Sequence, residues 1–249
     1  MKIAALYDIH GNLPALEAVL GEVLGAGVDE IVVGGDVVSG PMPREVLELL
    51  LGLEVPVRFI RGNADREVVA RMRGEEGGGV PAEFRGVVQW VAEQLQPDYE
   101  AVLAGWPAMV QMAVDGAGEV LFCHATPRND TEIFVRTTAE AKLLPVFAGV
   151  SAGVVVCGHT HMQFDRMVGS VRVVNAGSVG MPYGEPGAYW LLLGPRGVEL
   201  RRTVYDFARA GERIRATGYP MAEDFAENNV VRPPGEAEVL EVFGRGELR

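Results

Sequence analysis

The chain has 249 residues, 48% of them hydrophobic and 22% charged, which predicts one α/β domain with at most a small appendage. Its formal net charge of −12 argues against long nucleic acids as ligands, because their affinity rests on neutralisation of phosphates by lysine and arginine. No apolar stretch is as long as a membrane-spanning helix, about 18 residues, and the amino terminus lacks a secretory signal pattern, so we expect no membrane contact and a cytoplasmic location.

Strand-like and helical patterns alternate along the first part of the chain. Residues 2–7 form an apolar run, and residues 13–24 place leucines and valines on one helical face behind Pro14, which suits a first helical turn. A strand, a helix and another strand are then expected at residues 30–33, 44–53 and 55–60. Strands separated by helices pair in parallel, so this part predicts a mostly parallel sheet covered by helices.

The patterns that follow predict a second sheet. Residues 74–81 are rich in glycine and predict a loop before a helix at 83–95. Two short apolar runs, 110–114 and 119–123, flank the turn-rich "DGAG" and predict an antiparallel pair. A helix and more strands are then expected at 139–147, 153–157, 164–174 and 188–193. These elements together predict an α/β fold with two facing mixed β-sheets, a β-sandwich flanked by helices.

The end of the chain is charged and helical in pattern. It begins with "YDFARAGERIRATGYP" and holds too few apolar residues to bury an interior of its own. We therefore expect residues 206–249 to form a helical accessory segment that packs on the core of a domain spanning residues 1–205.

Oxygen ligands follow three successive predicted strands. Asp8 and His10 alternate at the end of the first strand, so that both side chains project to the same side. Asp36 follows two glycines at the end of the second strand, and Asn63 follows the third. Because open α/β sheets bind ligands at the carboxyl ends of their strands, we expect these side chains to meet.

The histidines of the chain extend this pattern. There are four of them, and each follows a predicted strand: His10, His124 in "LFCHATP", and His159 and His161 in "VVCGHTHM". Any one of them alone is as often a structural donor in a turn as a ligand. Four together at strand ends, beside aspartate and asparagine at matching ends, favour a metal site.

The number and kind of these side chains predict two metal ions. Seven candidates are too many for one tetrahedral zinc and suit two ions about 3.5 to 4 Å apart, joined by a bridging carboxylate. Mixed imidazole and carboxylate ligation favours transition metals over calcium or magnesium. We expect two divalent transition-metal ions, with manganese first and iron, zinc, nickel or cobalt as alternatives.

The motifs, taken in order, resemble those of a known family. They are D-x-H at 8–10, G-G-D at 34–36, G-N-x-D at 62–65, H at 124 and G-H-x-H at 158–161. Over residues 1–205 the chain resembles the calcineurin-like metallophosphoesterases, and more narrowly their small prokaryotic phosphodiesterase-type members. The resemblance implies a four-layer αββα fold and a dinuclear metal-dependent phosphoesterase that hydrolyses a phosphodiester or an activated phosphomonoester.

The resemblance also implies how the ligands divide between the ions. One ion would be held by Asp8, His10, Asp36 and His161. The other would be held by Asp36, Asn63, His124 and His159. Asp36 would be the bridge, and a hydroxide shared by both ions would attack phosphorus in line with the leaving group. Asn63 would also orient a phosphate oxygen, so the expected catalytic residues are Asn63, His124 and Asp36.

The sequence departs from many relatives at Ala64, where they carry a histidine that assists the leaving group. Alanine donates no proton, so we expect diesters or activated aryl phosphates to be preferred over alkyl monoesters. The loop at 175–180, "NAGSVG", resembles the family's glycine-serine loop, with a tight structural turn as the alternative. Asn12 is expected to support the ligands or to form a turn, and Asp65 to support its own loop. Three polar residues are candidates for the substrate mouth or for plain solvated positions: Arg128, Asn129 and Arg136.

Other functions compete with the phosphoesterase. One alternative is a catalytically weak metal-binding interaction module that has kept the ion site but lost turnover. Another is a nucleotide-specific hydrolase that cleaves dinucleoside polyphosphates or cyclic nucleotides, since the acidic charge balance disfavours long nucleic acid but not nucleotides. We expect a small phosphate ester as substrate. The sequence leaves the oligomeric state open, a homo-oligomer included.

Overall fold

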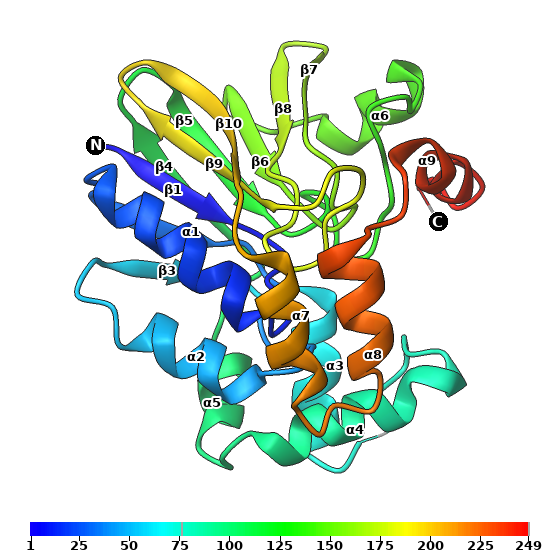
Figure 1. The fold of residues 1–249 in the computed structure, drawn as a ribbon. Helices are drawn as coiled ribbons and strands as arrows, with labels where there is room; N and C mark the ends of the chain where they lie inside the picture. Colours follow the sequence, from blue (N-terminus) through cyan, green and yellow to red (C-terminus); the bar gives the residue numbers. More distant parts are fainter. Residues whose placement is uncertain (76, 249) are drawn as a thin grey trace.

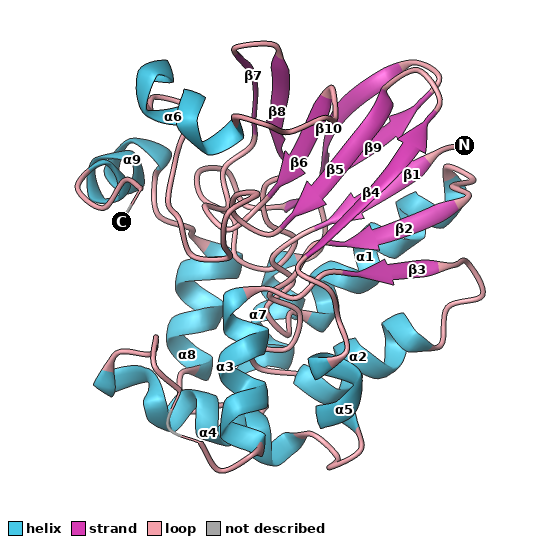
Figure 2. Cartoon of the chain, turned by 180° about the vertical axis from the view of Figure 1, so that it is seen from behind, coloured by secondary structure: helices cyan, strands magenta, loops and turns pink. Residues whose placement is uncertain are grey.

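Two five-stranded sheets face each other in the computed structural model, which describes residues 1–75 and 77–248 (Figure 1). Glu76, in the predicted loop at 74–81, and Arg249, in the predicted C-terminal segment, lie outside the described residues. Helices cover the outer faces of the sheets (Figure 2). The prediction of an α/β fold with two facing mixed sheets flanked by helices is confirmed.

The first sheet has the order β10-β9-β1-β2-β3. Its central strands, β1 (Ile3–Leu6), β2 (Glu30–Val33) and β3 (Val57–Phe59), are parallel, as the alternation with helices predicts. β9 (Ala188–Gly194) runs antiparallel to β1, and β10 (Gly197–Thr203) antiparallel to β9. The sequence assigned β9 to the second half and did not predict β10. That strand is at the edge of the sheet and carries charged residues, so its pattern lacks the apolar run of a central strand.

The second sheet has the order β4-β5-β6-β8-β7. The predicted antiparallel pair around "DGAG" is confirmed as β4 (Met109–Val114) and β5 (Gly118–Cys123). β6 (Val154–Cys157) and β8 (Val171–Asn175) continue the sheet in parallel, and β7 (Phe164–Val168) closes it antiparallel to β8.

Alternate residues of β1 serve two different cores. Ile3 and Ala5, with Tyr7 just after the strand, pack in the core that also holds buried residues of the second sheet, such as Phe122 and Val156. Ala4 and Leu6 point the other way, into the core beneath the helices. Because both faces of β1 are fully buried, the strand reads as a continuous apolar run and its carboxyl end is held firmly.

Most helices lie where the sequence predicts them. They are α1 (Leu13–Gly25), α2 (Pro43–Leu51), α4 (Arg85–Gln94) and α6 (Glu140–Phe147). The short η1 (Ala82–Phe84) precedes α4. Two helices were not predicted, α3 (Asn63–Met72) and α5 (Tyr99–Ala104). In the described part of the chain no helix combines the length and apolar character needed to span a membrane.

The last part of the chain forms α7 (Phe207–Arg215), α8 (Ala222–Phe225), the π-helical segment η2 (Ala226–Val231) and α9 (Glu236–Gly244). α7 and α8 stand side by side (Figure 1), and their apolar faces share a small core around Ile214 and Phe225. Arg213 of α7 pairs with Glu17 of α1 at 2.6 Å. α9 lies beside α6, where Lys142 pairs with Glu247 at 3.0 Å.

Candidate metal centre

The predicted ligands meet at the carboxyl ends of five strands, β1, β2, β3, β5 and β6. The loops that carry them converge between the strand ends and the helices, where Figure 2 shows them in pink. Six of the seven side chains form two clusters, in each of which the potential ligand atoms lie within 4.8 Å of one another. The first cluster is Asp8, His10 and His161, and the second is Asp36, His124 and His159. Asn63 adjoins the second cluster, with its side-chain oxygen 3.0 Å from His124 Nε2.

Asp36 faces both clusters. Its Oδ2 lies 3.7 Å from His10 Nε2 in the first cluster and 3.4 Å from His124 Nε2 in the second. In the first cluster Asp8 Oδ1 lies 3.4 Å from His161 Nε2. A carboxylate placed between two groups of imidazoles in this way has the position that a bridging ligand needs.

Several polar atoms of the two clusters would be better satisfied by a cation than by one another. Asp8 Oδ1 is buried and accepts no hydrogen bond from the described residues, which is costly for a carboxylate oxygen. His10 Nε2 and His161 Nε2 face each other at 3.2 Å. The Asn63 amide fits beside the cluster in two orientations. Turned over, its nitrogen donates to His124 Nε2; as placed, its oxygen faces the cluster and is available to a cation. A divalent ion in each cluster would satisfy these atoms together.

Backbone carbonyls fix the orientation of three of the imidazoles. In each ring Nδ1 lies within hydrogen-bond distance of a carbonyl oxygen, at 3.2 Å in His10, 2.9 Å in His124 and 2.7 Å in His161. The carbonyls belong to Ser39, Gly34 and Met181. Since Nδ1 donates its proton to the carbonyl, the Nε2 lone pair is directed into the cluster, as in metal-ligating histidines generally.

The ligands also share a strained backbone. Asp8, His10, Asp36, His159 and His161 have φ angles between 47° and 66°, in the left-handed region that residues with a side chain rarely adopt. Each such residue costs about 1–3 kcal/mol, and such residues concentrate at functional sites. Among the non-glycine residues described, Leu248 alone shares this conformation without belonging to a cluster. The strain is therefore tied to the aiming of these side chains.

Burial and charge set the protonation of the metal-free clusters. Burial lowers the pKa of His124, but the carboxylates of Asp36 and Asp8 raise it to about 10. Burial and the neighbouring His124 lower the pKa of His159 to about 4. Burial raises the pKa of Asp36, yet His124 and His10 hold it well below its usual range. Burial likewise raises the pKa of Asp8, but His161 and His124 hold it below its usual range. Both aspartates are thus ionised at neutral pH, and a cation has to displace the proton on His124.

Asp65 holds two loops of the centre together. Its Oδ1 accepts from the backbone N–H groups of Val37 and Val38 at 2.8 and 3.3 Å, and its Oδ2 accepts from that of Gly62 at 3.1 Å. This joins the loop of Asp36 to the start of α3. The prediction that Asp65 supports the backbone is confirmed.

The loop at 175–180 packs directly under Asp8. Ser178 Oγ donates to the Asp8 carbonyl and accepts from Met181 N–H, each at 2.8 Å. Asn12 Oδ1 caps α1, and its Nδ2 donates to the Gly180 carbonyl at 2.9 Å. The predicted turn is confirmed, because the Asn12 N–H donates to the Ile9 carbonyl at 3.0 Å. Support of metal ligands by Asn12 stays a prediction.

A cavity adjoins the second cluster at His124. It has a volume of about 210 Å³ and is lined by Arg61, Arg66 and Arg128, with Asn129 and Asp130. Arg66 pairs with Asp130 at 2.9 Å and Arg128 with Glu132, whereas Arg61 has no acidic partner within 4.0 Å in the described part of the chain. The expectation that Arg128 and Asn129 line the substrate mouth agrees with this geometry.

Arg136 does not share that position. It pairs with Glu236 at the start of α9 and is absent from the walls of the arginine-lined cavity, which favours the alternative reading of a solvated surface position. The sequence gives no signal for Arg61 and Arg66. Their role in the cavity depends on how β3 and α3 face the loop after β5, which only the assembled sheets define.

The fold and the paired clusters define a metal-dependent phosphoric ester hydrolase. The chain belongs to the calcineurin-like phosphoesterase superfamily, because the sequence model of the calcineurin-like phosphoesterase superfamily domain matches residues 1–193. The predicted family, fold class and class of enzyme are confirmed at this level. The identity of the ions and the roles of single ligands remain predictions.

Similar proteins agree with this assignment. An uncharacterized protein of Methanocaldococcus jannaschii is 26% identical over 235 residues, which are 85% of this chain and 91% of that protein. The phosphodiesterase YfcE of Escherichia coli is 38% identical over 77 residues, 27% of this chain and 42% of that protein. The crystal structure of a metallophosphoesterase from Sphaerobacter thermophilus covers 91% of this chain and 97% of its own, with 28% identity and a TM-score of 0.70.

Proposed function

We propose that the protein is a dinuclear metal-dependent phosphodiesterase that also accepts activated phosphomonoesters. The observation that carries this proposal is the Asp36 carboxylate, which faces His10 and His124 of separate clusters at 3.7 and 3.4 Å. The unsatisfied, buried Asp8 Oδ1 supports it, as does the similarity to the phosphodiesterase YfcE. Manganese is the first candidate for the ions, with iron, zinc, nickel and cobalt as alternatives.

Two divalent ions, when bound, would neutralise the phosphate charge and lower the pKa of the water molecule that attacks phosphorus. The chain itself positions the substrate. The Asn63 side chain adjoins the second cluster and can orient a phosphate oxygen. Arg61, which has no acidic partner among the described residues, offers its guanidinium in the cavity beside His124, and guanidinium groups match the geometry of phosphate oxygens.

Hydrolysis of bis(p-nitrophenyl) phosphate by the manganese-loaded protein tests the proposal. We expect metal-dependent release of p-nitrophenol that a chelator stops. The His124→Ala variant removes one Nε2 ligand and is the control for contaminating activity. Turnover by the wild type no faster than by His124→Ala would favour the metal-binding interaction module instead.

The chain offers no histidine to protonate a leaving group. All four histidines belong to the clusters, and Ala64, where many relatives carry one more, lines a cavity of about 280 Å³ with Val80, Pro81 and Phe84. We therefore expect bis-aryl diesters, whose leaving groups need no proton, to react at least about a hundredfold faster than alkyl monoesters, the usual contribution of general acid catalysis. Comparative kcat/KM values for the two ester classes measure this. A faster reaction of alkyl monoesters would contradict it.

A nucleotide-specific hydrolase is the second candidate. The observation in its favour is the arginine-lined cavity beside His124, which suits a second phosphate group of a dinucleoside polyphosphate or the phosphate of a cyclic nucleotide. Turnover of such nucleotides with a higher kcat/KM than bis(p-nitrophenyl) phosphate would favour it.

We also propose that residues 206–249 are an accessory segment of the domain at 1–205. The shared core around Ile214 and Phe225 and the ion pair between Arg213 and Glu17 support this organisation. A cytoplasmic location is proposed from the sequence, and the oligomeric state stays open.

A further inference from the structure

A large apolar cavity opens beside His10. Its volume is about 390 Å³, compared with about 150 Å³ for an apolar cavity that holds benzene. Part of its wall comes from η1 and α4, and another part from α8, η2 and the residues around them. Its largest apolar side chains are Phe84, Met181, Tyr183, Tyr219, Met221 and Phe225.

The residues that line the apolar cavity differ in charge from those that line the cavity beside His124. Of the residues that the structure describes, no lysine or arginine lines the apolar cavity, whereas three arginines line the other one. The charged side chain in the wall is Asp224, whose Oδ1 accepts from Asn228 Nδ2 at 2.8 Å. A negatively charged group is therefore disfavoured here, and an uncharged apolar group is favoured.

The cavity is continuous with the first cluster. His10 forms part of its wall, and so does Ser39, whose carbonyl oxygen contacts His10 Nδ1. Tyr183, another wall residue, stacks on the ring of His161 with centroids 5.6 Å apart and 22° between the planes. A group joined by an ester bond to a phosphate at the metal centre can therefore enter the cavity without leaving the site.

We propose that this cavity binds an apolar arm of the phosphodiester, of aromatic or branched aliphatic kind and at least the size of a phenyl ring. The inference rests on the proposed phosphodiesterase function and names the class of its substrate. Met221, Phe225 and their neighbours lie beyond the family match at residues 1–193. The C-terminal segment is thus a determinant of specificity, because it supplies the wall that selects the arm.

Binding of two phosphonates tests the inference without turnover. Phenylphosphonate and methylphosphonate share a head group with a stable carbon–phosphorus bond and differ only in the arm. With the manganese-loaded protein, calorimetry is expected to show phenylphosphonate binding about tenfold more tightly, because burial of the ring removes apolar surface from water. Phe84→Asp, in η1, and Met221→Asp, in the C-terminal segment, are expected to weaken phenylphosphonate binding about tenfold, since each places a charge against the arm.

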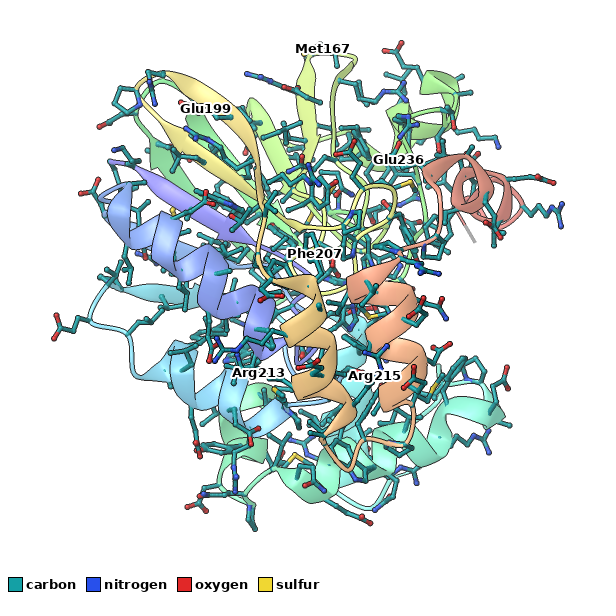
Figure 3. The ribbon with its side chains drawn as sticks, viewed as in Figure 1. Met167, Glu199, Phe207, Arg213, Arg215 and Glu236 are labelled. Carbon is teal, nitrogen blue, oxygen red and sulfur yellow. The ribbon has the colours of Figure 1, made fainter. Side chains whose placement is uncertain are left out.

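Met167→Asp is the matched control. Met167 is 53% exposed at the tip of β7, at the top of Figure 3, and does not line the cavity, whereas Phe84 is 42% exposed. Phe84→Asp and Met167→Asp thus both change an exposed apolar side chain to a charged one. The control is expected to keep the wild-type preference. Equal affinities for the two phosphonates in the wild type, or a preference that survives in both cavity variants, would overturn the inference. A preference without any hydrolysis of bis(p-nitrophenyl) phosphate would leave the cavity assignment standing and refute the phosphodiesterase.

Discussion

Replacing Asp36 by asparagine is expected to reduce the hydrolysis of bis(p-nitrophenyl) phosphate about a thousandfold and to lower the number of bound manganese ions from two to one. The physical reason is the position of Asp36 Oδ2 between His10 and His124. An amide keeps the shape of the side chain but loses the negative charge that two cations share. Loss of the several kcal/mol that one cation supplies to the transition state corresponds to about three powers of ten in rate. Steady-state kinetics and elemental analysis of the purified variant measure both effects.

Asp165→Asn makes the same chemical change away from the centre. Asp165 is on β7, where it pairs with Arg172 at the surface, so this control is expected to keep both ions and nearly all activity. An Asp36→Asn protein with two ions per chain and a rate within tenfold of the wild type would remove Asp36 from its proposed role.

Replacing Gly158 by alanine is expected to damage the centre without removing a ligand. A Cβ at Gly158 would lie 2.4 Å from Asp8 Oδ2 and 2.6 Å from a ring carbon of the buried Tyr7, so Asp8 must move. We expect a loss of about 1–3 kcal/mol in the free energy of unfolding from overpacking. A displacement of about 1 Å at the reacting groups costs about a hundredfold in rate. Denaturant titration and the kcat/KM for bis(p-nitrophenyl) phosphate measure the two effects separately.

Gly153→Ala provides the comparison for that variant. Gly153 directly precedes β6 and Gly158 directly follows it, and a Cβ at Gly153 meets nothing within 4 Å. This variant is expected to match the wild type in stability and rate. If Gly158→Ala also matched the wild type, the close packing of Asp8 against this turn would contribute neither to stability nor to the rate of hydrolysis.

The candidate ligands were predictable from the sequence because most of them follow short, buried and largely apolar strands. In β1, β2 and β6 every residue is buried, so the runs stand out and mark the strand ends where Asp8, Asp36 and His159 lie. The order of the motifs then fixed the family. The positive φ angles of these residues could not be predicted from the sequence, because residues other than glycine normally have negative φ angles.

Other elements lack such a signal. α3 begins at the candidate ligand Asn63 and is rich in charged residues, so it resembles a loop until Asp65 is seen to cap it. β10 is a charged edge strand. The position of Arg136 depends on α9, whose Glu236 is 100 residues farther along the chain. The apolar cavity is lined by both α4 and η2, which are separated by more than half of the sequence, so no local sequence pattern predicts it.

Each ligand cluster draws on both sheets. Asp8 and His10 follow β1 of the first sheet while His161 follows β6 of the second, and Asp36 follows β2 while His124 and His159 follow β5 and β6. Cations held there would clamp together two layers whose shared interior is otherwise apolar. Loading of the ions and alignment of the layers would then be a single coupled event, so that only a correctly closed sandwich could be catalytically competent.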